Sequence, residues 1–502
     1  MAKQSNGSQV ASDMIEDGAP EPCPASATDN LSEHHKNYLL ERHGTVDLDP
    51  LPTMDPADPL NWPKWKKKSN LWIVSFLAFM ATFTATSIIP AFLDIATDLG
   101  VTIQDASYLT SAHIALVGVA PLFWRPLSKR FGRRPVFVGS TLLALVCNLG
   151  CAKSYSYGAM MACRVLGAFF ISPAMALGSA VVTETFFSHE RAQNMGIWTL
   201  MLTVGVPIGP LVFGPVVTHI GYRWSYWILA SLNGFQVLLY SLFGPETLYH
   251  GGDPSSEISA FKTQYLSVRR IDPTPFTMFE LFRPLRLFLS VQVSATSMGY
   301  AVVFLFASIL CSVEIPSLLQ QKFRLSAEQL GFQFAGIIIG SVLGEILVGR
   351  AANWWRLYMT RKLSHSPSKE SRLWISYLGY VLSCLGIVVF LVFIPEAPEA
   401  DWTVTPIVGT GIAAFGNQIV GTVLTTYAVD VHREDSASVG VFVNIVRSLV
   451  GFIGPFWFPP VFDNVGTAPS AGIFCAIIFG VGILPTILVH CFVKRKGVGS
   501  CL

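Results

Sequence analysis

The chain has 502 residues, of which 51% are hydrophobic and 13% are charged, and its formal net charge is +2. Soluble domains carry about 25% charged residues, so this composition excludes an ordinary soluble enzyme or binding domain. The apolar residues gather in blocks of about 20 residues, the length that crosses a bilayer as a helix. The sequence therefore predicts an all-α integral membrane protein with many spans.

The start of the chain differs from the rest. Residues 1–62 are polar and rich in Ser, Asp, Glu and Pro, which predicts a disordered cytosolic tail. They contain no apolar core of a secretory signal, so the first span is expected to act as its own insertion signal. Four lysines stand directly before that span: Lys64, Lys66, Lys67 and Lys68.

Twelve apolar blocks follow, with a polar loop at 245–285 between the sixth and the seventh. The predicted spans are 70–93, 107–127, 135–152, 157–184, 194–217, 224–244, 286–312, 331–349, 373–394, 404–428, 437–458 and 471–492. This pattern predicts an N-terminal bundle over 63–244, a cytosolic central loop over 245–285, a C-terminal bundle over 286–492 and a short cytosolic tail over 493–502.

The basic residues support this number of spans. With both termini in the cytosol, the inner segments hold 25 lysines and arginines, whereas the outer segments hold four, which are Lys153, Arg223, Lys322 and Arg324. Cytosolic loops of membrane proteins carry such an excess of basic residues, and a wrong number of spans would scramble it. We expect a multi-pass protein of the plasma membrane, with a vacuolar or vesicular membrane as the alternative.

The fifth apolar block contains an unusual run of glycine and proline, GVPIGPLVFGP. Pro207 and Pro210 each leave a helix carbonyl without its N–H donor, and lipid supplies no water to replace it. Neighbouring helices are therefore expected to cover the gap. Gly205, Gly209 and Gly214 allow such helices to approach closely.

The same phrase returns late in the chain. Ile208-Gly209-Pro210 is matched by Ile453-Gly454-Pro455, at an offset of 245 residues. An echo at about half the chain length is what a duplicated helical bundle predicts.

Six plus six spans, a long central loop and an echoed fifth and eleventh span resemble the major facilitator superfamily over residues 58–493. Short motifs resemble its fungal drug:proton antiporters: Asp58-Pro59-Leu60-Asn61-Trp62-Pro63, Arg164-x-x-Gly167, Gly205-x-x-x-Gly209-Pro210-x-x-x-Gly214, Pro245-Glu246-Thr247-Leu248, Tyr427-Ala428-Val429-Asp430 and Asn444-x-x-Arg447. The resemblance implies two pseudo-symmetric six-helix bundles that rock about a central cavity. It also implies export of a small organic molecule, such as a drug, toxin or secondary metabolite, in exchange for protons.

The loop between the second and third spans departs from this resemblance. Arg125 stands where the superfamily has a glycine, and Lys129 replaces an acid that is expected to contact the start of the eleventh span. We hypothesise an inverted latch, in which Lys129 binds Glu434 or Asp435 just before that span. The alternative is a plain cation at the membrane surface. The rest of the gating motif is kept: Arg130, Gly132, Arg133 and Arg134.

Ionisable residues inside spans usually face a cavity or a partner. Arg164 is predicted to be a cavity arginine that acts on a nearby acid or an anionic substrate, with helix pairing as the alternative. Glu345 is the candidate for carrying the proton, with a structural role toward Arg350 as the alternative. His113 can titrate near neutrality or can be an ordinary core histidine.

Three further charged residues lie near span ends. Glu184 and Asp430 end the fourth and tenth spans at corresponding places, and we expect them to form gating salt bridges with arginines of the inner loops. Arg447, in the eleventh span, is expected to be a packing or gating residue.

Uncharged polar residues at membrane depth suggest a binding cavity. The candidates are Gln292, Ser297, Tyr300, Asn417 and Gln418. Amide and hydroxyl groups with aromatic walls suit a neutral or weakly acidic organic compound. The alternative is that these groups only hold helices together.

The sequence has no phosphate-binding Gly-x-x-x-x-Gly-Lys-Ser/Thr phrase, no metal-ligand spacing and no catalytic set. We therefore expect a transporter rather than an enzyme, driven by the proton gradient without a cofactor. The expected partners are a small organic substrate, protons and the lipid bilayer, with no nucleic acid, and the expected state is a monomer. An uptake transporter and a membrane receptor that binds without transport are the competing hypotheses.

Overall fold

The computed structural model describes residues 31–46, 48–249, 278–348, 372–398, 402–432 and 436–499. The regular elements in these ranges are helices. Eleven are long and apolar enough to cross a membrane, and the bent pair α4 (Ile103–Val119) and α5 (Pro121–Phe131) makes a twelfth if it counts as one span. The predicted all-α membrane fold is confirmed.

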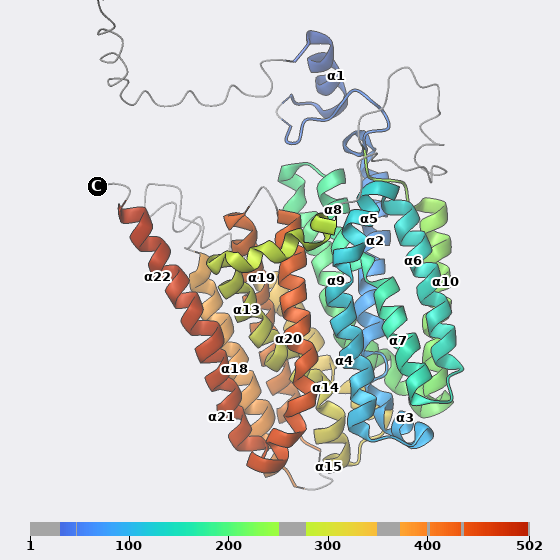
Figure 1. Ribbon diagram of the computed structural model, residues 1–502, viewed down its shortest axis with the longest axis vertical. Coiled ribbons are helices and arrows are strands. Elements are labelled where there is room, and N and C mark those ends of the chain that lie inside the picture. The colour runs from blue at the N-terminus through green and yellow to red at the C-terminus, as the bar shows by residue number, and fades with distance from the viewer. Residues whose placement is uncertain are drawn as a thin grey trace, which may run out of the picture.

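The helices form two groups that lie side by side (Figure 1). The first half contains α2 (Lys64–Thr86), α3 (Phe92–Leu99), α4, α5, α6 (Arg133–Ala152), α7 (Tyr157–Ile171), α8 (Pro173–Thr185), α9 (Ser188–Ile220) and α10 (Tyr222–Phe243). The second half contains α13 (Val291–Phe304), the span Ala327–Val348 that begins with α16 (Ala327–Phe332), α18 (Leu373–Glu396), α19 (Thr405–Val431), α20 (Ser436–Val465), α21 (Thr467–Ile477), the π-helix η8 (Ile478–Ile483) and α22 (Leu484–Gly499).

Two names for the ends of the bundle are used below. The helix α1 (Glu33–His43) and the end of α22 lie at one end of the bundle, called the α1 end (Figure 1). The helices α3 and α15 (Gln321–Phe323) lie at the opposite end, called the far end.

The glycine- and proline-rich run lies inside an unbroken helix, α9. Pro210 cannot donate to the carbonyl of Val206, and the hydroxyl of Thr86 from α2 donates to that carbonyl instead, over 2.6 Å. One turn earlier, Thr82 donates to the carbonyl of Leu202 over 2.8 Å. The prediction that a neighbouring helix covers the gap is therefore confirmed for Pro210.

The glycines of this run are sites of close helix contact. A Cβ atom on Gly205 or Gly209 would lie within 3 Å of the threonine hydroxyls and carbonyls of α2. A Cβ atom on Gly214 would lie 2.7 Å from the carbonyl oxygen of Ala327, in the second half. The run therefore joins α9 to α2 along most of its length and to α16 near its end.

The echo in the sequence corresponds to a repeat in the backbone. Each of the two proline-rich helices, α9 and α20, ends before a glycine with φ of 89°, Gly221 or Gly466. These two glycines stand at the same offset of 245 residues as the echoed phrases. Only glycine adopts this φ with an extended ψ at little cost, so both halves use the same device to end the helix.

The expectation of a disordered tail is wrong for the described part of 31–62. This part contains α1 and the short 3-10 helix Pro59–Asn61, and Leu39 and Leu60 are buried against Phe187 of the first half. The overall polarity of the tail concealed these few apolar residues, which suffice to dock the segment.

The seventh span ends at Val313, close to its predicted end at 312, but helical structure continues beyond it. After α13, the helix continues through the π-helix η4 (Leu305–Leu310), α14 (Cys311–Val313), the π-helix η5 (Pro316–Gln320) and α15. The backbone N–H of Glu314 donates to Leu310, and that of Leu318 donates to Glu314, so helical bonding passes through Glu314. An acid followed closely by a proline has the composition of a loop, and the wide π turns accommodate both.

Candidate functional site

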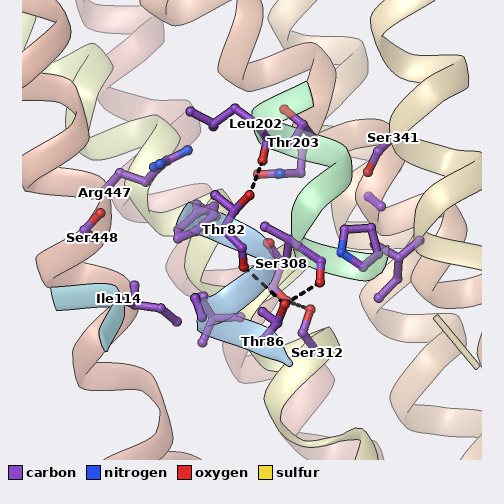
Figure 2. Close-up of a pocket in the computed structure, with 18 of the residues that line it drawn as sticks. Thr82, Thr86, Ile114, Leu202, Thr203, Ser308, Ser312, Ser341, Arg447 and Ser448 are labelled. Atoms are coloured by element: carbon purple, nitrogen blue, oxygen red, sulfur yellow. Dashed lines mark hydrogen bonds between the residues drawn. The ribbon is translucent and has the colours of Figure 1, made fainter. Parts of the chain in front are cut away.

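A cavity of about 80 Å³ lies between the two halves. Most of its lining is apolar, with hydroxyl groups from both halves that include Thr82, Thr203, Ser308, Ser312, Ser341 and Ser448. Figure 2 shows Arg447 and Ser448 across the pocket from Ser341. The cavity is smaller than the roughly 300–1,000 Å³ typical of drug-sized sites, so it must widen to take in such a molecule.

Three of the predicted polar candidates line this cavity: Tyr300, Asn417 and Gln418. Ser297 is buried elsewhere in the bundle and its hydroxyl has no hydrogen bond among the described residues. Gln292 is half-buried and does not line the cavity.

Arg447 is the one charged residue among the described residues that line the cavity. Its guanidinium donates to Tyr300 Oη at 3.1 Å and to Asn444 Oδ1 at 2.8 Å, and it lies 4.6 Å from the ring centroid of Phe304. Both hydrogen-bond partners are neutral. The sequence predicted a packing or gating residue, and this prediction did not place Arg447 at the cavity. The Asn444-x-x-Arg447 motif was the signal that could have placed it there.

Arg164 does not line the cavity. It is 2% exposed and donates from Nη1 to the carbonyl of Thr84 and from Nη2 to that of Ala85, both at 2.9 Å. These carbonyls belong to the last turn of α2 and lack helical N–H partners, and a cation is favourable at that end of a helix dipole. The helix-pairing alternative describes Arg164, and the predicted cavity position is corrected.

Glu345 lies on the span Ala327–Val348 and contacts α19. Its carboxylate accepts hydrogen bonds from Gln418 Nε2 and, at 3.4 Å, from Thr422 Oγ1. Gln418 lines the cavity whereas Glu345 does not. Glu345 thus lies one side chain behind the cavity wall, and the proposed proton-carrying role stays a prediction.

His113 is buried in α4, 1% exposed. Among the described residues, neither ring nitrogen has a hydrogen-bond partner at an acceptable distance and angle. It lies near Arg164 and does not line the cavity. This environment matches the core-histidine alternative.

The far end of the bundle is closed by contacts between the halves. The rings of Tyr108 and Phe456 stack at a centroid distance of 4.3 Å. The backbone N–H of Glu328 donates to Thr218 Oγ1 at 2.9 Å, and the Glu328 carboxylate lies 3.4 Å from His219 Nε2. Together with the Gly214 contact, these pairs hold α9 against α16 and α4 against α20.

The ion pairs expected for Glu184 and Asp430 are present at the α1 end. Arg133 Nη2 lies 2.7 Å from Glu184 Oε1, and Arg372 Nη1 lies 2.9 Å from Asp430 Oδ2. Each pair joins the end of one span to the start of the span before it, within one half. Their role in gating stays a prediction.

Glu246, after the sixth span, binds the start of α6. Its two carboxylate oxygens accept from the backbone N–H groups of Arg133 at 2.8 Å and Arg134 at 2.9 Å. Burial raises the pKa of Glu246, and these N–H groups oppose the shift. The connection is possible because Gly132 turns the chain with φ of 94°. Arg134 also donates to carbonyls at the end of α10.

A different residue of the same loop, Arg125, contacts the start of α20 in the structure. Arg125 Nη1 donates to Ser438 Oγ at 2.6 Å, which joins α5 to the start of α20. Lys129 is exposed and Arg130 is buried. Glu434 and Asp435 lie outside the described residues, so the Lys129 latch stays a prediction, whereas Arg125 connects the two halves.

Among the described residues, no cluster of His, Cys, Asp or Glu could hold a metal ion. A bundle of about twelve spans in two halves, with a mixed polar and apolar cavity between them, defines a secondary transporter. The sequence profile of the Major Facilitator Superfamily matches residues 71–455. The chain belongs to this superfamily, whose members are multi-pass membrane transporters rather than enzymes.

Two relatives and one solved structure show the extent of the similarity. Efflux pump vrtL of Penicillium aethiopicum is 26% identical over 438 residues, which cover 85% of this chain and 86% of the relative. Citrate exporter 1 of Aspergillus niger is 24% identical over 423 residues, which cover 79% and 80%. The crystal structure of the human organic anion transporter MFSD10 (TETRAN) has a TM-score of 0.56 and 17% identity, and it covers 85% of this chain and 100% of its own.

Proposed function

We propose that this transporter exports a small organic molecule in exchange for protons, by alternating access between the α1 end and the far end. Its relatives include an efflux pump and a citrate exporter, which supports export. The α1 end is the cytosolic end in this proposal, because basic residues concentrate in the segments there.

Arg447 is the observation that carries the substrate class. Its guanidinium is half-buried between two neutral partners and an aromatic ring, and a cation that is partly removed from water is stabilised by a nearby anion. The surrounding hydroxyl groups offer further hydrogen bonds. We therefore propose a weakly acidic organic substrate that carries a carboxylate.

The test is efflux from proteoliposomes with an imposed pH gradient. Carboxylic acids and their neutral methyl esters form matched substrate pairs. We expect gradient-dependent efflux of an acid and weaker efflux of its ester. Because a hydrogen bond to a charged group is worth about 1.5–3 kcal/mol, Arg447→Gln is expected to raise KM for the acid roughly tenfold to a hundredfold. The KM for the ester should change little.

Arg223→Gln is the matched control, because Arg223 pairs with Asp98 at the far end, away from the cavity. If Arg447→Gln affects acid and ester equally, the carboxylate proposal fails. Efflux that ignores the gradient would leave a facilitator, and binding without flux would favour the receptor hypothesis.

A further inference from the structure

The second half contains a buried carboxyl group that the sequence interpretation passed over. Glu314 is 2% exposed. Among the described residues, its side chain makes one hydrogen bond, in which Ser317 Oγ donates to Glu314 Oε2 at 2.6 Å. The same hydroxyl lies 3.0 Å from the Glu314 carbonyl oxygen.

No positive charge among the described residues compensates this carboxyl. Arg447 of α20 is bonded to Tyr300 and Asn444, and Lys322 donates to the carbonyls of Ile394 and Pro395. Apart from the exposed Arg324 that ends α15, the other charged groups on the elements packed around this stretch are acids: Glu328 of α16, Glu396 of α18, Asp430 of α19 and Asp463 of α20.

An ionised carboxylate in such a place costs several kcal/mol, because neither water nor a cation stabilises it. Glu314 therefore holds its proton while it is buried. It can release the proton only when the helices around it separate and water reaches it. Ionisation that depends on conformation is the property that a residue coupling proton movement to transport must have.

The backbone around Glu314 is suited to such a change. The π-helices η4 and η5 lie on either side of it, and π-helical turns occur frequently at functional sites. Ser308, Ser312 and Val313, from the same helical stretch, line the cavity. A substrate in the cavity thus contacts the turn that directly precedes Glu314.

We propose that Glu314 carries the proton that this transporter exchanges for its substrate, and that it stays neutral while it is buried. When the far end opens, the carboxylate takes up a proton from the solution there. When a substrate enters from the α1 end and widens the cavity at the turn before Glu314, water reaches the carboxyl and the proton leaves on that side. This inference rests on the proton-coupled export proposed above and adds the residue that performs the coupling.

The test separates coupling from transport. In proteoliposomes, Glu314→Gln is expected to lose the acceleration of efflux by the pH gradient, because glutamine has no exchangeable carboxyl proton. Exchange of labelled substrate at equal pH on both sides is expected to keep the wild-type rate, since exchange of one substrate molecule for another moves no net proton. Glu314→Asp, which retains a carboxyl group, should respond to the gradient.

Glu345→Gln tests the rival candidate for carrying the proton, and Glu396→Gln, at the exposed end of α18, is the acid-to-amide control. Gradient-driven efflux that persists in Glu314→Gln would overturn the proposal, as would loss of coupling in Glu345→Gln alone. A wild-type protein that ignores the gradient would instead refute the proposed proton coupling itself, so the two failures are distinguishable.

A second measurement does not depend on how well a variant folds. Dicyclohexylcarbodiimide reacts with protonated carboxyl groups in apolar surroundings. In the wild-type protein at neutral pH, we expect mass spectrometry to find the adduct on Glu314 and not on Glu328, whose side chain is 35% exposed beside His219. An unmodified Glu314 at neutral pH would overturn the claim that it is held neutral.

Discussion

Replacing Thr86 by valine removes the hydroxyl that covers a carbonyl left open by a proline. Valine has nearly the same shape as threonine, so packing against α9 is preserved. The Val206 carbonyl then loses its described donor, because Pro210 has no N–H. An unsatisfied buried group costs about 1–3 kcal/mol in soluble proteins, whereas interhelical bonds in membranes average about 0.6 kcal/mol with a maximum near 1.7. We expect Thr86→Val to cost about 1–2 kcal/mol of unfolding free energy.

The assay is reversible unfolding in mixed micelles, combined with a double-mutant cycle. Pro210→Ala restores an N–H that can bond to Val206, so Thr86→Val should cost much less in that background. Thr82→Val is the matched control, because Leu202 keeps its own helical donor, Val206 N–H, beside the 2.8 Å bond from Thr82. Equal costs of Thr86→Val with and without Pro210 would refute the reasoning.

Two further predictions concern stability and conformation. Arg164→Ala leaves the carbonyls of Thr84 and Ala85 without their charged donor. At about 1.5 kcal/mol for each bond, we expect it to cost roughly 3 kcal/mol of unfolding free energy in the same assay. Substrate affinity of the folded protein should stay unchanged, and a large loss of affinity would place Arg164 in the binding site after all. Gly214→Ala places a Cβ 2.7 Å from the Ala327 carbonyl oxygen, so we expect it to hinder closure of the far end. A cysteine introduced there by Thr218→Cys should then be labelled faster by a thiol reagent. Labelling equal to that of the Thr218→Cys parent would contradict this prediction.

The membrane fold was predictable because its signals are local. Span length, basic loops and the glycine–proline run depend on composition and backbone chemistry over short stretches. The cover that α2 provides for α9 followed from the same reasoning, since a proline in a membrane helix requires a donor from elsewhere. The sequence could not name Thr86 as that donor, because the register between two helices depends on how they pack.

The site was harder to predict because a membrane arginine has more than one use. Arg164 and Arg447 both lie inside apolar spans, and only the packing shows that the first binds the end of α2 while the second faces the cavity. Glu314 was missed for a different reason. An acid two residues before Pro316 has the composition of a loop, and the π-helical turns that bury it have no simple sequence signature.

The folded N-terminal segment has a mechanical consequence. It packs against Phe187, between α8 and α9, and Asp55 accepts a hydrogen bond of 2.8 Å from Tyr249, which follows α10. Lys67 at the start of α2 donates to the Leu60 carbonyl at 2.9 Å. The segment therefore connects the start of α2, the turn between α8 and α9 and the end of α10, and we expect these helices to move together. When the two halves move against each other, we expect the first half to rotate as one body at this end, with little bending of its single helices.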